Sequence, residues 1–216
     1  MNGLNLYQWL GWPGLSATHR CTTDRCGEEP VTPVERTMQP MRQRVASILF
    51  TDIAGFSVQM ATHPQLEVVA DLDRYFGRVS RCVGAAQGRV DKLMGDGLLA
   101  VFDTPEAAIT AALAIQQAVA YFNARQLARR RSVFPTRIAV DTGPVIEAQL
   151  RACPTQQPTV FGSAVNFAAH LLKQTAPGRI LISQRTRTEL PDQLSVGQER
   201  LVVVDTEASL NTVYEM

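Results

Sequence analysis

The sequence predicts an α+β fold whose elements follow the order βαββαβ, with a small αβ tail. Three observations support this prediction: short apolar runs bounded by turn residues, two long segments with helical periodicity, and an Asp-Gly turn at Asp96 and Gly97 between two strand-like segments. Helices in such an arrangement pack on a sheet, and we expect them on one face of it. There is no internal repeat of solenoid period.

The length and composition are typical of one soluble globular domain with an appendage. The chain has 216 residues, of which 45% are hydrophobic and 19% charged, and its formal net charge is +1. A net charge this small gives no large electrostatic surface for nucleic acid. No uninterrupted apolar run approaches the roughly 18 residues of a membrane-spanning helix. We therefore expect neither a nucleic-acid partner nor a membrane span.

The first part of the chain differs in composition from the rest. Residues 1–43 are rich in Gly, Pro, Thr and Arg without sustained periodicity, so we expect a poorly ordered leader and linker, followed by a folded domain over residues 44–216. The start lacks a basic leader and a long apolar centre, which predicts a cytoplasmic protein. The four cysteines, Cys21, Cys26, Cys82 and Cys153, do not form a disulfide framework and are interpreted as free thiols. The alternative for Cys21 and Cys26 is a small disulfide loop or a metal site, but no Cys/His pair of matching spacing follows them.

The first half of the domain is predicted as a strand, two helices and a hairpin. The apolar run Val45–Ile53 predicts a buried strand that leads into Ala54-Gly55-Phe56-Ser57 and a helix. Helical spacing predicts a second helix over Leu66–Val83, with its Asp and Arg residues on the solvent face. The segments Arg89–Met94 and Leu98–Phe102 form a hairpin around Gly95-Asp96-Gly97. The residues expected on the buried face of the second helix are Leu66, Val69, Leu72, Phe76, Val79 and Val83.

The second half begins with a long helix. Thr104 is a helix cap and Pro105 suits the first helical position, so the helix extends from Pro105 to about Arg131. Residues Arg137–Ala148 predict two strands joined by a turn at Gly143 and Pro144. The remaining predicted elements are a helix over Gly162–Lys173, a short helix over Gln184–Leu190, and strands over Arg179–Ser183, Leu201–Val204 and Thr212–Tyr214.

Two acidic residues lie where predicted strands end. Asp52 is near the end of the first strand, just before the start of a helix whose free backbone N–H groups suit phosphate. Asp96 is at the tip of the hairpin, where a carboxylate on a rigid turn is well placed to bind a hard cation. From the residues alone, Asp52 is also interpretable as a helix cap, and Asp96 as an ordinary turn residue.

Three motifs together resemble the catalytic domain of class III nucleotidyl cyclases. They are Phe50-Thr-Asp-Ile-Ala-Gly-Phe-Ser57, Lys92-Leu-Met-Gly-Asp96 and Phe161-Gly-Ser-Ala-Val-Asn-Phe-Ala-Ala169, in the family's order and at about its spacing. The resemblance covers residues 44–216 and implies the nucleotide cyclase fold, a ferredoxin-like βαββαβ sandwich. It also implies a homodimer, because in this family one subunit supplies the metal ligands of each site and the other supplies the base-reading residues.

The resemblance further implies conversion of a nucleoside triphosphate, ATP in the first instance, to the 3′,5′-cyclic nucleotide and pyrophosphate. Two Mg²⁺ or Mn²⁺ ions would be held by Asp52, Asp96 and the carbonyl of Ile53. Such ions activate the ribose 3′-hydroxyl and clamp the triphosphate. The backbone amides expected to hold phosphate are those of Ala54, Gly55 and Phe56.

Lys92 and Thr159 match the positions that read the base in adenylate-specific relatives, and Asn166 matches the residue that orients the ribose. Some relatives have an acid where Thr159 stands. A hydroxyl both donates and accepts, so it discriminates between bases less firmly than a carboxylate. A pyrimidine nucleotide is therefore an alternative substrate.

The chain departs from the family pattern at His170, where relatives have an arginine that contacts the transition-state phosphate. Histidine offers fewer donors than arginine and is charged only part of the time near neutral pH. Losing such a contact typically lowers the rate by about 10²-fold or more. The family's basic residue of the late strand is also replaced, with Asp205 near its place and Arg200 nearby as a substitute. The alternative function is thus a weak or inactive cyclase-like module that binds nucleotide.

Overall fold

The computed structural model describes residues 41–149, 158–191, 198–203 and 210–216, without the side chains of 198–203, 210 and 211. All of these residues belong to one unit of the chain, Met38–Met216. The predicted boundary between residues 43 and 44 stays a prediction, because residues 1–40 lie outside the described part. Cys21, Cys26 and Cys153 also lie outside it, whereas Cys82 is a half-buried free thiol.

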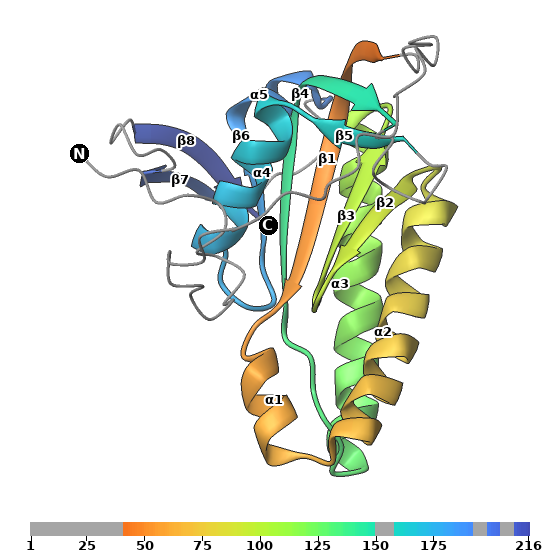
Figure 1. Ribbon diagram of the computed structural model, residues 1–216. Helices are drawn as coiled ribbons and strands as arrows, with labels where there is room; N and C mark the ends of the chain where they lie inside the picture. Colours follow the sequence, from red (N-terminus) through yellow and green to blue (C-terminus); the bar gives the residue numbers. More distant parts are fainter. Residues whose placement is uncertain (1–40, 150–157, 192–197, 204–209) are drawn as a thin grey trace, which may run out of the picture. The chain divides into compact units, whose positions relative to one another are not determined.

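The described strands form one eight-stranded sheet in the order β2-β3-β1-β4-β6-β8-β7, and β5 pairs with β4 away from this path (Figure 1). The two central strands, β1 (Arg42–Ile53) and β4 (Thr136–Ala148), pair antiparallel over their whole length. Only β4 and β6 run parallel among these pairs. The other strands are β2 (Arg89–Met94), β3 (Gly97–Phe102), β5 (Thr159–Phe161), β6 (Ile180–Ser183), β7 (Gln198–Val203) and β8 (Leu210–Glu215).

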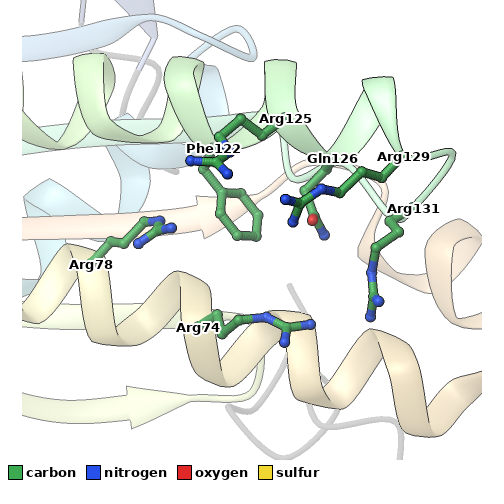
Figure 2. A pocket seen from close by; sticks show the side chains of 7 residues that line it. All are labelled: Arg74, Arg78, Phe122, Arg125, Gln126, Arg129 and Arg131. Carbon is green, nitrogen blue, oxygen red and sulfur yellow. The ribbon is translucent and has the colours of Figure 1, made fainter.

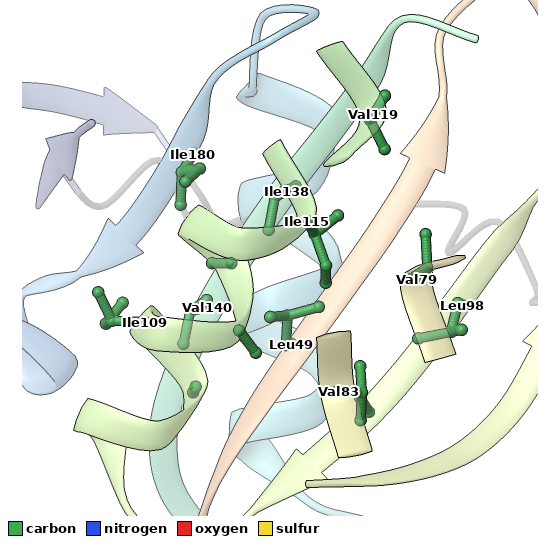
Figure 3. Close-up of a cluster of buried hydrophobic side chains, with 14 of the residues drawn as sticks. Leu49, Val79, Val83, Leu98, Ile109, Ile115, Val119, Ile138, Val140 and Ile180 are labelled. Atoms are coloured by element: carbon green, nitrogen blue, oxygen red, sulfur yellow. The ribbon is translucent and has the colours of Figure 1, made fainter. Parts of the chain in front are cut away.

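The helices cover both faces of the sheet, so the expectation of a single covered face is wrong. Helices α2 (Gln65–Ala85) and α3 (Pro105–Ala128) pack on the face that carries Leu49 and Ile53 of β1 (Figure 3). Helix α4 (Ser163–Gln174) packs on the opposite face. The physical reason is that β1 is apolar on both faces, which is typical of a strand buried on both sides. The short helices are α1 (Phe56–Thr62) and α5 (Gln184–Glu189).

Helix α3 is the core helix of the domain. It starts as predicted, with Thr104 Oγ1 accepting a hydrogen bond of 3.2 Å from the amide of Ala107. Among the described helices it alone is long and apolar enough to cross a membrane by length and composition. Its apolar face, including Ile109 and Ile115, is instead buried against the sheet (Figure 3). The helix ends at Ala128, three residues earlier than expected.

The predicted turn at Gly143 and Pro144 does not exist, because β4 continues through both residues. Gly143 pairs with Ala46 and Pro144 with Val45 of β1. Among the described residues, no strand pairs with the other edge of β4 between Asp141 and Val145. An edge without a partner accommodates a residue that has no N–H group.

The predicted buried face of α2 is confirmed at Phe76, Val79 and Val83 but is wrong at the start of the helix. Leu66 is 87% exposed and Val69 is 53% exposed, whereas Val68 is fully buried. Asp71, which was assigned to solvent, is also fully buried and accepts hydrogen bonds from Arg74 and Arg131. An acidic residue on a core-facing stripe is tolerated when cations satisfy it, and an apolar pattern alone does not reveal this.

Candidate active site

The ladder between β1 and β3 brings the two predicted metal ligands to the same end of the sheet. Thr51 of β1 pairs with Leu98 of β3, so Asp52 follows directly beside the turn that carries Asp96. Gly97 allows this approach, because a Cβ atom there would lie 2.8 Å from the carbonyl oxygen of Thr51. The turn is therefore packed onto the backbone of β1.

The electrostatics of Asp52 and Asp96 indicate that their charges interact. Burial raises the pKa of Asp96, and the negative charge of Asp52 raises it further. Both acids also act on the phenol of Tyr75, whose pKa is raised to about 12, chiefly by burial. Such mutual repulsion favours a bound cation, which relieves it.

Arg137 of β4 is the charge partner of Asp52. It lies opposite Asp52 in the ladder and donates a hydrogen bond to Asp52 Oδ2. Among the described residues no group of three or more His, Cys, Asp or Glu side chains forms a metal cluster. A Mg²⁺ ion usually takes one or two protein carboxylates and completes its shell with water and substrate phosphates. The pair of acids therefore fits such an ion.

The predicted phosphate cradle lies at the start of α1. Gly55 caps this helix in the left-handed conformation, with φ of 71°. The amide of Ala54 donates a 2.8 Å hydrogen bond to the carbonyl of Pro135, so it is already engaged. The amides of Gly55 and Phe56 form no hydrogen bond with a described residue and are the two available donors. Ile53, between Asp52 and this turn, is held by pairing with Thr136.

Asp52 and Lys92 project from the same face of the sheet. Side chains alternate along a strand, so Asp52 shares the face of Phe50, and residues paired across an antiparallel ladder also share a face. Phe50 pairs with Leu99, and Leu99 pairs with Lys92 of β2. This is the face on which α4 packs. The sheet thus orients the predicted metal ligand and the predicted base reader toward one side.

A β-bulge shapes the base-reading corner. The register of β2 against β3 shifts between Val90 and Lys92, which leaves Asp91 as the extra residue. Neighbours in a regular strand point to opposite faces, but a bulge re-aims one of them. Asp91 and Lys92 consequently contact the same partner, Thr159 of β5.

The three side chains at the bulge form one hydrogen-bonded cluster. Lys92 Nζ donates to Thr159 Oγ1 and lies 3.2 Å from Asp91 Oδ2. The Thr159 hydroxyl in turn donates to Asp91 Oδ2 at 2.7 Å. The Asp91 side chain is completely buried. Lys92 Nζ also lies 5.8 Å from the centre of the Phe161 ring.

A chain of ion pairs fixes this cluster to the central strands. Arg89 contacts Asp91 at 3.1 Å and Glu147 of β4 at 3.4 Å. Arg44 of β1 contacts Glu147 at 3.0 Å, and this hydrogen bond is the main reason why the pKa of Glu147 is lowered. Asp91, Arg89 and Glu147 were missed by sequence reasoning. The only sequence feature that pointed to this cluster was an acid, Asp91, directly before Lys92. In a regular strand the two side chains would point to opposite faces, so their common contact with Thr159 could be inferred only with knowledge of the bulge.

Asn166 and His170 lie on α4, one helical turn apart as predicted. They are two residues, or about 200° of helix, beyond the buried Ala164 and Ala168, so they face away from the sheet. Neither side chain forms a hydrogen bond or ion pair with another described residue. Within one chain the structure therefore brings Asp52 to Asp96 and Lys92 to Thr159, and leaves the residues of α4 apart. Asp205 and the side chain of Arg200 lie outside the described part.

Comparison with known proteins identifies the family. Residues 38–213 match the family model of the adenylate and guanylate cyclase catalytic domain. Adenylate cyclase 1 of Rhizobium meliloti is 33% identical over 137 residues, which are 60% of this chain and 20% of that protein. Curated relatives are thus longer, and the chain spans between 20% and 30% of their length.

Two solved structures show the same fold. The adenylyl cyclase CyaB from P. aeruginosa has a TM-score of 0.76 and 20% identity, with 82% of this chain and 95% of that chain covered. The guanylyl cyclase Cya2 has a TM-score of 0.75 and 24% identity, with 81% and 92% covered. Fold, motif order and family match agree, and the chain belongs to the adenylate and guanylate cyclase catalytic domain family.

Proposed function

We propose that the chain is a nucleotidyl cyclase that converts ATP to 3′,5′-cyclic AMP and pyrophosphate at a homodimer interface. The observation that carries the proposal is that Asp52 lies beside the turn that carries Asp96, on a sheet whose same face presents Lys92 to Thr159. One half of this arrangement suits metal-bound phosphates, and the other suits a base. A cyclase needs both.

The reaction forms a bond between the ribose O3′ and the α-phosphorus and breaks the bond from that phosphorus to the bridging oxygen of pyrophosphate. The O3′ proton passes to solvent and pyrophosphate leaves. Asp52, Asp96 and the carbonyl of Ile53 would hold two divalent ions. When bound, these ions lower the pKa of the hydroxyl and offset the charge of the triphosphate.

The remaining residues bind and orient the substrate. The amides of Gly55 and Phe56 donate to phosphate oxygens. The guanidinium of Arg137, at the edge of the acid pair, is placed to contact the same phosphates once a cation binds Asp52. Asn166 holds the ribose, which fixes the angle at which O3′ meets the phosphorus. His170 supplies a weaker phosphate contact than an arginine does.

The hydrogen-bond directions at Thr159 support a base that carries an amino group where guanine carries O6. Its hydroxyl proton is directed to Asp91, and one lone pair accepts from Lys92. A hydroxyl oxygen in this state has only acceptor capacity left. It therefore accepts from the exocyclic amino group of adenine and repels the O6 oxygen of guanine. Cytosine also carries such an amino group, so CTP is the competing substrate.

Exposed apolar side chains beside this corner support the homodimer. Leu93 and Met94 of β2 are 54% and 43% exposed, and Phe161 of β5 is 42% exposed. They flank Lys92 and Thr159 in the sequence. Apolar side chains gathered next to polar site residues are typical of an interface. A second subunit here would bring the outward face of α4, with Asn166, toward the acid pair of its partner.

A second candidate is a nucleotide-binding module without turnover. Two features favour it: His170 stands in place of an arginine, and Asp52 is engaged by Arg137. This module would bind ATP with divalent ions and release no product.

The test is an assay of the purified chain with each of ATP, GTP, CTP and UTP in the presence of Mn²⁺ or Mg²⁺, with cyclic products separated by chromatography. We expect cyclic AMP as the main product. Nucleotide-dependent thermal stabilisation without any cyclic product would support the binding module instead. Cyclic GMP as the main product would overturn the assignment of Thr159.

A further inference from the structure

A pocket of about 180 Å³ lies between α2 and the end of α3 (Figure 2). Both helices pack on the face of the sheet opposite α4, so the pocket is separate from the Lys92 and Thr159 corner. Five arginines dominate its lining. We call it the arginine pocket, and its residues are Arg74, Arg78, Phe122, Arg125, Gln126, Arg129 and Arg131.

The arginines are arranged as two facing pairs. Arg74 and Arg78 lie one turn apart on α2. Arg125 lies in the last turn of α3, and Arg129 is the C-cap residue that follows this helix. Figure 2 shows both pairs pointing into the space between the helices, with Arg131 closing one end. Like charges one turn apart destabilise a helix. Placing two such pairs across one groove opposes folding unless something offsets their charge.

Within the described part of the chain, acidic residues offset only part of this charge. Asp71 is buried beside the pocket and accepts hydrogen bonds from Arg74 and Arg131. Burial alone would raise the pKa of Asp71, but these bonds lower it, so the carboxylate is charged. The exposed Glu67 lies 3.7 Å from Arg131.

The other three arginines, Arg78, Arg125 and Arg129, have no acidic partner among the described residues. Arg78 packs 5.3 Å from the centre of the Phe122 ring, and its buried Nε has no hydrogen-bond partner. Arg125 donates to the hydroxyl of Tyr121 and packs against its ring. The pocket thus has unmet donors and an excess of positive charge.

We infer that the arginine pocket binds a compact polyanion carrying two or more phosphate groups. Guanidinium groups form paired hydrogen bonds with phosphate oxygens and are the side chains best suited to them. The pocket volume of about 180 Å³ far exceeds the ~10–15 Å³ that one water needs in the same measure, so the pocket has room for a group of several phosphates. Phe122 is only 3% exposed and is covered by Arg78, so it offers no surface for stacking.

Inorganic pyrophosphate or tripolyphosphate and the phosphate chain of a nucleotide share this chemistry. The test is isothermal titration calorimetry of the full chain with pyrophosphate, tripolyphosphate and ADP, at constant ionic strength with EDTA. Removing divalent ions suppresses phosphate binding at the acid pair. We expect one saturable site per chain. Equal affinities for ADP and pyrophosphate would indicate a nucleotide as the source, and tighter pyrophosphate binding would indicate an inorganic ion.

Variants locate the site. The double variant Arg125→Gln/Arg129→Gln should raise the Kd for pyrophosphate by about tenfold or more, because it loses at least one hydrogen bond from a charged group. Arg81→Gln removes an exposed arginine of α2 that does not line the pocket and should change the Kd by less than about twofold. Arg129→Gln alone, at an exposed side chain, is the second variant if the double one unfolds. Binding that survives these changes, or that Arg137→Gln abolishes instead, would overturn the inference.

Discussion

Replacing Asp91 by Asn separates the structural role of this buried acid from its role in base selection. Asp91 accepts from Thr159 at 2.7 Å and contacts Arg89 at 3.1 Å and Lys92 at 3.2 Å. In Asp91→Asn one acceptor oxygen becomes an amide donor. An amide that donates to Thr159 releases the hydroxyl proton, which then turns toward the base. The position becomes a donor as well as an acceptor.

The cost in stability follows from the contacts. Breaking a fully buried ion pair costs about 3–5 kcal/mol, but Arg89 and Lys92 are 36% and 38% exposed and can turn to water. The loss of a hydrogen bond to a charged group, about 2 kcal/mol, is the better measure. For a chain of this size that lowers Tm by about 4–8 °C. Asp71→Asn is the matched control, because Asp71 is equally buried between two arginines but lies on α2.

Two measurements are made on both variants: the ratio of kcat/KM for ATP to kcat/KM for GTP, and the Tm of thermal unfolding. The first measurement rests on the proposed activity. We expect both variants to lose stability to a similar extent. Only Asp91→Asn should lower the ATP-to-GTP ratio, by about tenfold, as expected when one hydrogen-bond discrimination is lost. If the ratio moves equally in both variants, or in neither, the direction of the Thr159 hydroxyl does not select the base.

Three further changes test the acid pair and its surroundings. Because folding raises the pKa of Asp96, the folded chain loses stability as the pH rises from the unfolded-state pKa of this carboxyl through its folded-state pKa. Asp96→Asn should therefore raise the Tm of the metal-free chain at pH 7, and raise it less near pH 4. An equal gain in Tm at both pH values would exclude the ionisation of Asp96 as the cause. Gly97→Ala forces a Cβ against the carbonyl of Thr51 and should lower Tm by about 4–8 °C, or ~2 kcal/mol, in thermal melts. Gly84→Ala, a helical glycine with nothing within 4 Å, should raise Tm instead. His170→Arg should raise kcat by about tenfold or more in the product assay, and an unchanged kcat would show that His170 does not face the phosphate.

The sequence predicted the elements that carry periodic apolar residues. The hairpin around Asp96 and the helix bearing Asn166 exist within one residue of the expected bounds. The strand that carries Asp52 ends at Ile53 as predicted and begins three residues earlier than expected. Each has a local cause: an apolar run, a turn glycine or a helical stripe. The family resemblance that rested on these three segments is confirmed by the family match.

Features that depend on tertiary contacts could not be predicted. Pro144 is a strong turn signal, yet pairing with β1 keeps β4 extended. Asp71 looks like a solvent residue until Arg131, 60 positions away, is seen to bond it. Asp91 gains its partners from a bulge, and no local pattern distinguishes a bulged strand from a regular one. In each case a distant segment decides how a local signal is used.

The central claim is that the acid pair of one chain and the α4 residues of another complete one catalytic site. The most direct measurement mixes two variants, Asp52→Ala and Asn166→Ala, each inactive alone, and follows cyclic product from ATP and Mn²⁺. A mixed dimer retains one intact site of two, and half of the dimers in an equal mixture are mixed, so the account predicts about a quarter of the unmodified activity. Activity no higher than that of either variant alone would contradict it.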